Sequence, residues 1–275
     1  MSNRYKMPNE TETITKIDIE LCLTNAIPPT ISAIDEYEAT SRKLIILAGE
    51  ADSVNDKFQI RLLLLGLVSS CEYYFRRVLS ETVSSCPISR AACSKHDIKY
   101  SAATYFSERN IGLALTDDAV FSGAQNIELE TKRLTGISVS DSTSLKEALS
   151  EYQKVCVIRH ATVHSYGLLG GKNFAELDIQ TPGNREVALT SNSFQEIADV
   201  CLNLVRAYNR QLWTTIISRM KSKGILKFNS NADDILLFSK IVSVFWSESV
   251  LFNAGDSATI YASIIKSMEE ESVLA

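Results

Sequence analysis

The sequence predicts an all-α protein, a helical bundle with a small β-hairpin or ordered loop in its second half and extra C-terminal helices. Apolar residues recur at steps of three and four over most of the chain, which is the spacing of a buried helix face. Alternation of apolar and polar residues, the signal of a half-buried strand, is convincing only between residues 174 and 190. With 275 residues and 45% hydrophobic content, the chain is long enough to bury one sizeable core.

Composition excludes several classes of protein. The first twenty residues are polar throughout, unlike a signal peptide, and no apolar stretch approaches the roughly 20 residues that a membrane span needs. The six cysteines show no CxxC or CxxH spacing, which argues against a structural zinc site and fits thiols in a reducing compartment. We therefore expect a cytoplasmic protein that does not cross a membrane. A net charge of -5 supplies no global basic field, so any contact with nucleic acid must be local.

The first half of the chain predicts an arm followed by long helices. Residues 1–30 show little periodicity and end near a pair of prolines, so we expect an N-terminal arm. Residues 31–220 are expected to form the main helical domain. Within it, residues 56–83 have the pattern of a long amphipathic helix, which Pro87 ends. The apolar seam of this helix consists of Leu64, Val68, Cys71, Phe75 and Val78.

The remaining elements follow in chain order. They are short helices and loops at 88–116, helices at 117–134 and 145–164, a hairpin or ordered loop at 174–190, and helices at 193–220, 233–252 and 257–268. Ser144 and Glu147 match a capping box at the start of the 145–164 helix, and Asn231 and Asp256 are expected to cap the last two helices. These last helices make residues 221–275 a C-terminal extension that we expect to pack on the same domain.

The helix predicted at 145–164 carries the most informative polar residues. Near its end, ahead of Gly167, Arg159 is followed by His160 and His164, two of the three histidines in the protein. On an ideal helix these three side chains project at roughly 0°, 100° and 140° over about 7.5 Å of rise. One helix end therefore presents a cation and two imidazoles.

Three interpretations of this cluster remain open. Histidine in the last turn complements the helix dipole and belongs to many ordinary polar faces. His160 and His164 share a face and suit a metal ion, but Ala161 stands where the zinc protease motif HExxH has glutamate, and His96 is distant. The third interpretation is catalysis on a phosphodiester, with the motif supplied twice across a symmetric dimer. We expect neither a metal nor a cofactor.

The pattern Arg159-His160-Ala-Thr-Val-His164, entered from an apolar helix and followed by Ser-Tyr-Gly, resembles the R-x4-6-H signature of the HEPN superfamily. Members of that superfamily are helical bundles that dimerise so that two such motifs face one cleft, and many are metal-independent endoribonucleases. The resemblance covers residues 31–220, in which a long helix carrying Glu72 precedes the motif helix. His160 departs from the Asn or Asp that often follows the arginine, so its role as a catalytic group or as an orienting group stays open.

The resemblance implies cleavage of RNA through attack of the ribose 2′-OH on the neighbouring phosphate. His164 would act as acid or base, Arg159 would hold the phosphoryl oxygens, and His160 would support them. Glu72 stands beside an apolar seam, where a carboxylate is costly without a partner. It is interpreted either as the partner of Arg159 or of a histidine, or as a surface glutamate at the edge of its helix.

Three further residues are candidates for RNA binding. Arg76 and Arg77 follow Glu72 by one turn and would supply local positive charge, although solvated helix arginines are more common. Tyr166 would stack on a base or cap the helix end. The resemblance also implies a homodimer, a role as toxin or antiphage defence effector, and an antitoxin or regulatory partner. The alternatives are a non-catalytic HEPN interaction or regulatory module and a plain helical scaffold in which Arg159 is a salt-bridge partner.

Overall fold

The computed structural model describes residues 15–106, 111–139, 142–181, 183–248 and 257–273. The chain divides into two compact units, residues 1–30 and 31–275, and each is described by itself. In the first unit, the 3-10 helix η1 (Ile19–Cys22) begins after Asp18, whose side chain accepts a hydrogen bond from the Glu20 N–H. In the described part of this unit, residues 15–30, the large aliphatic side chains are exposed; they are Ile17, Ile19, Leu21, Leu23 and Ile27.

The second unit is built from helices. In chain order they are α1 (Ala33–Ser53), α2 (Lys57–Ser85), α3 (Pro87–Cys93), α4 (Tyr100–Tyr105), α5 (Ile111–Thr116), α6 (Ala124–Thr135), α7 (Thr143–His164), α8 (Gly171–Glu176), α9 (Ser191–Ser222), α10 (Ala232–Phe245) and α11 (Ser257–Val273). Within the described residues, sheet-like pairing is limited to an isolated bridge between Leu168 and Glu186. The all-α class predicted from the apolar spacing is confirmed.

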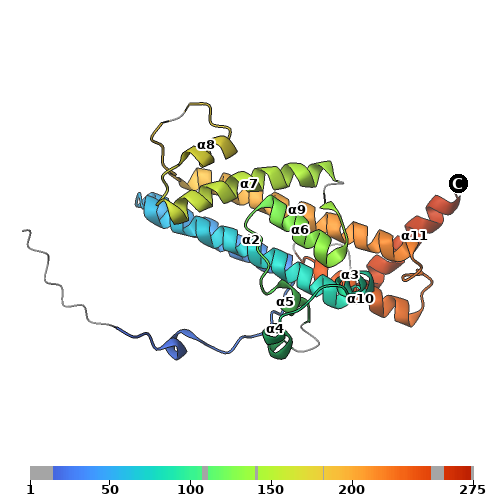
Figure 1. Cartoon of the computed structure of the whole chain (residues 1–275). Helices are drawn as coiled ribbons and strands as arrows, with labels where there is room; N and C mark the ends of the chain where they lie inside the picture. The colour runs from blue at the N-terminus through green and yellow to red at the C-terminus, as the bar shows by residue number, and fades with distance from the viewer. Residues whose placement is uncertain (1–14, 107–110, 140–141, 182, 249–256, 274–275) are drawn as a thin grey trace, which may run out of the picture. The chain divides into compact units, whose positions relative to one another are not determined.

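The long helix α2 forms the centre of the bundle. It contacts α1, α7, α9 and α10, and in Figure 1 it runs alongside α7 and α9. Its predicted seam is confirmed, because all five seam residues are fully buried. At the middle of the core, the Phe75 ring meets the Tyr208 ring of α9 edge-on, with 4.9 Å between ring centroids. Aromatic pairs of this geometry add roughly 0.5–1.5 kcal/mol to what burial alone contributes.

Most long helices begin and end where capping chemistry predicts. The Asp56 side chain accepts a hydrogen bond from the Gln59 N–H at 2.9 Å at the start of α2, and Pro87 follows its end. At the start of α10, Asn231 accepts from the Asp233 N–H at 3.0 Å, as expected of an N-cap. The predicted helix at 193–220 is α9, and the predicted helix at 257–268 lies within α11, whose expected cap Asp256 falls outside the described residues.

Two predicted helix starts are wrong. Ser142 rather than Ser144 caps α7: Ser142 has an extended backbone, and its Oγ accepts from the Leu145 N–H at 3.5 Å. The helix predicted from residue 117 begins only at Ala124. Its expected first turn is instead a loop that Arg76 of α2 holds by donating to carbonyl oxygens there, including that of Ala119 at 2.7 Å.

The helix α10 ends earlier than predicted, at Phe245 rather than residue 252. Trp246 already has an extended backbone. The chain then contacts α1, where the Ser247 hydroxyl and the Glu248 N–H both donate to the Asp35 carboxylate, at 2.6 and 3.1 Å. This docking against the first turn of α1 competes with continuation of the helix, and residues 249–252 lie outside the description.

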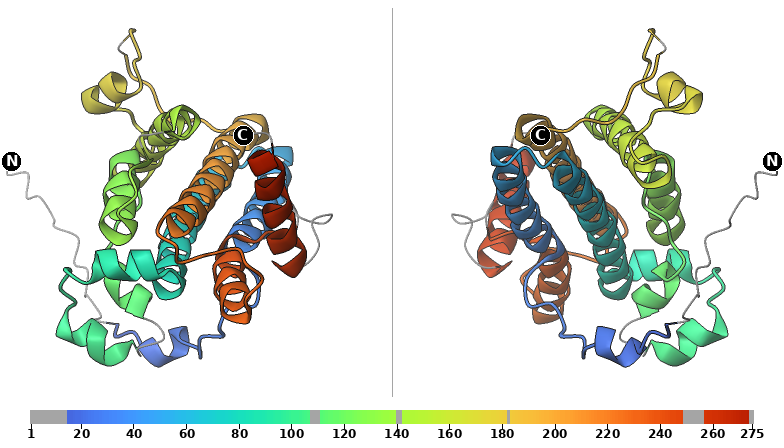
Figure 2. Two further views of the ribbon diagram at one scale, coloured as in Figure 1. Left: turned by 90° about the vertical axis from the view of Figure 1, so that its right-hand side faces the viewer. Right: turned by 90° about the vertical axis from the view of Figure 1, so that its left-hand side faces the viewer.

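The segment predicted as a hairpin or ordered loop at 174–190 is a loop that begins inside a short helix, α8. Helix formation is favoured locally because the Asn173 side chain accepts from the Gly170 N–H at 2.9 Å. Backbone pairing joins the start of this loop to its return, with Leu168 opposite Glu186, and does not form a hairpin around the Thr181 turn. Both views in Figure 2 show α8 and this loop standing off the bundle.

Two further features bear on accessibility. None of the helices in the described part of the chain is both long and apolar enough to cross a bilayer. All six cysteines are free thiols; Cys22 is exposed, whereas the other five are buried in the second unit.

Candidate active site at the end of helix α7

The sequence around Gly167 ends α7 in a defined way. The N–H groups of Ser165 and Gly167 both donate to the Ala161 carbonyl, each at 3.0 Å, so the last turn closes on one acceptor. Tyr166 and Gly167 both adopt left-handed backbone conformations, with φ of 52° and 93°. Glycine adopts such conformations without the steric cost that a side chain brings, which explains its place directly after the motif.

Helix α2 holds this turn from the side. Arg61 donates from Nη1 to the Tyr166 carbonyl at 3.0 Å, and its guanidinium lies 5.0 Å from the centre of the Tyr166 ring. The Phe58 ring also lies beside that ring, with 6.3 Å between centroids. Tyr166 is nevertheless 72% exposed. Part of the ring is thus supported by α2 while most of it remains accessible, and base stacking by Tyr166 stays a prediction.

The return of the loop fixes the other side of the turn. The Val187 N–H donates to the Gly167 carbonyl at 2.8 Å, and the Leu169 N–H donates to the Arg185 carbonyl at 2.9 Å. The end of α7 is therefore held between the first turns of α2 and the segment that leads into α9.

The two motif histidines lie together on the solvent side of α7. Their ring centroids are 4.4 Å apart, with an angle of 44° between the ring planes, and both residues are exposed. One turn of helix accounts for this contact, because His160 and His164 are four residues apart. Two imidazoles at this spacing can serve one substrate group, one as a proton acceptor and the other as a donor.

Arg159 faces α2 and pairs with Glu72. Its Nη2 lies 3.6 Å from Glu72 Oε1, an ion-pair distance that is longer than a hydrogen bond. That oxygen is buried and has no hydrogen-bond partner within the described structure. Burial raises the pKa of Glu72, and the positive charges of Arg159 and Arg76 oppose the shift without cancelling it. Glu72 Oε1 is therefore a buried acceptor whose hydrogen bond is not made, and it can accept one from a donor that comes closer than Arg159 does.

The structure thus divides the three predicted catalytic residues and the supporting Glu72 into two pairs. Arg159 is engaged with Glu72 on the α2 side, while His160 and His164 contact each other on the solvent side. Arg159 keeps 29% of its side chain exposed, so its guanidinium is accessible to a ligand without leaving the protein surface. The arrangement offers a half-buried cation with a half-buried counter-charge, next to two exposed imidazoles.

The two other arginines predicted to bind RNA both make contacts within the protein, and RNA binding by them stays a prediction. Arg77 is buried; it forms ion pairs with Glu36 of α1 and Glu81, and it also donates to the Ile31 carbonyl. The solvent-facing position expected for it was wrong, since α1 covers that face of α2.

The N–H groups of Arg76 likewise donate to groups of the protein itself. It binds the carbonyl oxygens of the loop after α5, and its guanidinium lies 5.6 Å from the centre of the Phe121 ring. Its charge still acts locally, because it contributes to the electrostatic environment of Glu72.

Sequence reasoning missed Arg61 and Phe58 as part of the site. Arg61 lies 105 residues from Tyr166 in the chain, so no local pattern joins them. The one available signal was that Arg61 interrupts an otherwise apolar run at the start of α2.

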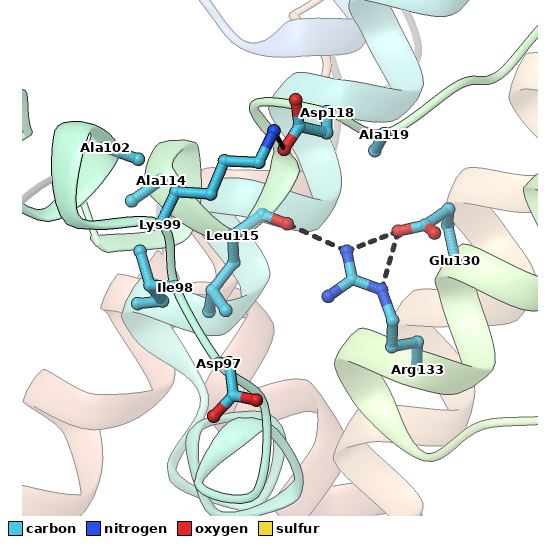
Figure 3. Close-up of a pocket in the computed structure, with 10 residues that line it drawn as sticks. All are labelled: Asp97, Ile98, Lys99, Ala102, Ala114, Leu115, Asp118, Ala119, Glu130 and Arg133. Carbon is cyan, nitrogen blue, oxygen red and sulfur yellow. Dashed lines mark hydrogen bonds and ion pairs between the residues drawn. The ribbon is translucent and has the colours of Figure 1, made fainter.

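A separate cavity of about 460 Å³ lies near α4, α5 and α6. Figure 3 shows two ion pairs on its walls, Lys99 with Asp118 and Arg133 with Glu130. Arg133 also donates to the Leu115 carbonyl at 2.8 Å. Asp97 also lines the cavity, and none of the predicted site residues does.

Histidine, cysteine and carboxylate side chains do not gather in threes that suit a metal ion anywhere in the described residues. Comparisons of the chain with protein-family models, with curated proteins and with solved structures gave no match.

Proposed function

We propose that this protein is a metal-independent endoribonuclease of the HEPN type, acting at a composite site that two copies of the chain build together. The observation that carries the proposal is the exposed His160–His164 pair at the end of α7, directly beside an arginine with a half-buried carboxylate partner. The all-α bundle around the motif is consistent with the resemblance.

The reaction needs no external nucleophile. The ribose 2′-oxygen forms a bond to the adjacent phosphorus while the bond from phosphorus to the 5′-oxygen breaks, which leaves a 2′,3′-cyclic phosphate and a 5′-hydroxyl. One imidazole takes the 2′-OH proton and another gives a proton to the departing 5′-oxygen. His164 fills one of these roles, with His160 or a histidine of the second copy filling the other.

Arg159 stabilises the charge that develops on the phosphoryl oxygens, because its guanidinium stays ionised and donates in a planar fork. Glu72 acts as a positioning residue. Its carboxylate lies within ion-pair distance of Arg159 and so restricts the guanidinium to the α2 side of the motif helix.

An apolar surface supports dimerisation next to the motif. We call it the apolar rim; it consists of Phe58, Leu62, Val163, Tyr166 and Leu168, which are between 47% and 72% exposed. It joins the first turns of α2 to the end of α7, so a second copy seated on it would bring two motifs close together. Exposed apolar surface of this kind is typical of interaction sites.

The catalytic test is to incubate purified protein with single-stranded RNA in excess EDTA and to compare wild type with Arg159→Ala and His164→Ala. We expect both variants to lose at least about 100-fold in rate, since general acid–base groups contribute roughly 10²–10⁴-fold and a donor that stabilises transition-state charge roughly 10²–10³-fold. His96→Ala is the matched control, because His96 lies outside the motif, where its Nε2 contacts the Arg133 carbonyl. Products should carry 5′-hydroxyl ends, and equal cleavage by wild type and His164→Ala would refute the proposal.

The composite nature of the site has its own test. Val163→Glu together with Leu168→Glu places charge on the apolar rim and should convert a dimer into a monomer with strongly reduced cleavage, although Arg159 and His164 are intact. Leu236→Glu is the control, because Leu236 is a comparably exposed leucine on α10. A wild-type protein that is monomeric in solution and still cleaves RNA would contradict the shared site.

Two observations favour the alternative of a non-catalytic interaction or regulatory module. Arg159 already has a counter-charge within its own chain, and the net charge of -5 disfavours RNA in general. Under this alternative the apolar rim binds a regulatory protein or an antitoxin, and wild-type protein leaves RNA intact in the assay above.

A further inference from the structure

A second candidate site lies in the C-terminal half of the bundle, independent of the proposed ribonuclease motif. A cavity of about 700 Å³ is lined by residues of α1, α9, α10 and α11 and by the residues that directly follow α10. In Figure 1 this is the end of the bundle where α10 and α11 are labelled. Small-molecule sites in proteins typically have volumes of about 300–1,000 Å³, so this cavity is of suitable size.

Apolar and aromatic side chains form most of its wall. Trp213 and Trp246, the only tryptophans of the chain, both line it, and we call it the tryptophan cavity. Trp213 is fixed by Phe238 and Phe245, whose ring centroids lie 5.7 and 5.9 Å from its own. The apolar or aromatic part of a ligand would therefore pack against a tryptophan whose position is already fixed by its neighbours.

The charged side chains among the described lining residues are two cations, Arg206 and Arg210, and none of these lining residues is a carboxylate. Arg206 is paired with Glu38 at 2.8 Å. The Arg210 side chain, in contrast, makes no hydrogen bond or ion pair with any described residue, and it is exposed. The neighbouring Asn209 is not available to a ligand, because it accepts from the Tyr74 hydroxyl and donates to the Phe245 carbonyl.

Among the other described polar side chains of the wall, the Ser247 hydroxyl donates to Asp35 and the Ser263 hydroxyl donates to the Ile260 carbonyl, which leaves the two indoles. The indole N–H groups of Trp213 and Trp246 have no acceptor among the described residues. The tryptophan cavity thus differs from the one in Figure 3, where each lining arginine or lysine has an acidic partner on the same wall. Donors without acceptors on an apolar wall suit a ligand that brings an anionic group and an apolar body.

We propose that the tryptophan cavity binds a small organic anion, with its carboxylate, sulfonate or phosphate at Arg210 and its apolar or aromatic part against Trp213 and Trp246. Charge attraction to Arg210 selects the anion, while burial of the apolar part against the aromatic wall supplies most of the affinity.

The chain carries its own reporter for this site. Because both tryptophans line the cavity, all intrinsic tryptophan fluorescence originates there. The probe is 8-anilinonaphthalene-1-sulfonate, an aromatic anion, added to the full-length protein. We expect quenching of tryptophan emission with energy transfer to the dye. Octanoate should displace the dye, whereas 1-octanol, its uncharged counterpart, should displace it at least about tenfold less effectively. Preference for the dye over octanoate identifies an aromatic ligand, and the reverse identifies an alkyl carboxylate.

Two variants and one control variant test the assignment of the ligand to this cavity. Arg210→Gln should weaken binding of both anions about tenfold while leaving 1-octanol unaffected, because hydrogen bonds to charged groups contribute on this scale. Lys221→Gln makes the same change in net charge on the same helix outside the cavity and should bind as wild type does. Ser263→Phe places a ring on the cavity wall and should reduce binding of all three probes. Circular dichroism establishes that each variant is folded.

Three results would overturn the proposal. They are dye binding without a change in tryptophan emission, equal affinities of wild type and Arg210→Gln for octanoate, and equal displacement of the dye by octanoate and 1-octanol. The first would place the dye on other apolar surface, such as the exposed aliphatic residues between positions 17 and 27.

Discussion

Replacement of Asp234 by alanine should destabilise the C-terminal helices more than any other single change at the start of α10. The Asp234 carboxylate accepts from the Lys227 N–H at 2.9 Å, from the Phe228 N–H at 2.8 Å and from the Tyr261 hydroxyl at 2.5 Å. It is only 7% exposed. One side chain therefore ties the loop after α9, the first turn of α10 and the helix α11 together.

The size of the effect follows from these three bonds. Hydrogen bonds to a charged acceptor contribute about 1.5–3 kcal/mol each, but truncation costs are less than additive within one network. We expect Asp234→Ala to lower the free energy of unfolding by about 3–4 kcal/mol. Tyr261→Phe removes one of these three bonds and also the acceptor of the Ser230 N–H, which donates to the Tyr261 hydroxyl at 3.3 Å, while the N–H groups of Lys227 and Phe228 keep their carboxylate. It should therefore cost about 1–2 kcal/mol. Urea denaturation followed by circular dichroism measures both.

The effect should also depend on pH. Burial alone raises the pKa of Asp234, but the Tyr261 hydroxyl and the two backbone N–H groups favour the carboxylate and lower the pKa overall. Because the pKa of Asp234 is lower in the folded state, the stabilisation that the ionised carboxylate provides is complete above its pKa in the unfolded state, about 3.9. It is lost as the pH falls through its pKa in the folded state. The difference between wild type and Asp234→Ala should therefore be constant from pH 7 to 5 and shrink below about pH 4. A loss smaller than about 1 kcal/mol at pH 7, or a difference that persists unchanged into acid, would refute the reasoning.

Three further predictions concern the site and its supports. Gly167→Ala should cost about 1–2 kcal/mol in urea denaturation, because φ is 93° and a Cβ would lie 2.8 Å from Arg61 Nη1; an unchanged midpoint would contradict the strain. Burial raises the folded-state pKa of Glu72, so wild type should lose stability as the pH rises from about 4 through that value, and Glu72→Gln should lack this slope; parallel stability curves of the two proteins would argue against it. Arg77→Met should cost about 2–3 kcal/mol, because it leaves two carboxylates facing a buried position, and thermal unfolding of wild type and variant at the same midpoint would show that the pairing contributes little.

Long apolar faces were predictable because they depend only on residues a few positions apart. The seam of α2 and the extent of α9 are of this kind, since one face of each is buried over many turns. The late start of α6 was not predictable. The loop before it is held by Arg76, which lies about forty residues earlier in the chain, and spacing within a segment carries no information about such a contact.

The same distinction holds for the candidate site. The partner of Arg159 could be anticipated, because a carboxylate beside an apolar seam is costly alone, and the structure places Glu72 next to it. The environments of Arg76 and Arg77 could not, since a helix pattern gives the direction of a side chain but not what packs against it. The catalytic roles of Arg159, His160 and His164 stay predictions that rest on the resemblance and on the assays above.

One thiol of the protein is exposed and five are buried, so the folded protein can be labelled at a single position. A thiol-reactive dye should modify the folded protein once, at Cys22, and thereby mark the N-terminal unit without any engineered residue. Buried thiols react only when the structure opens, so the slow appearance of further label would report opening of the second unit at equilibrium. Because Cys71, Cys156 and Cys201 lie in the core formed by α2, α7 and α9, the rate at which they react would measure how often the scaffold of the motif helix comes apart.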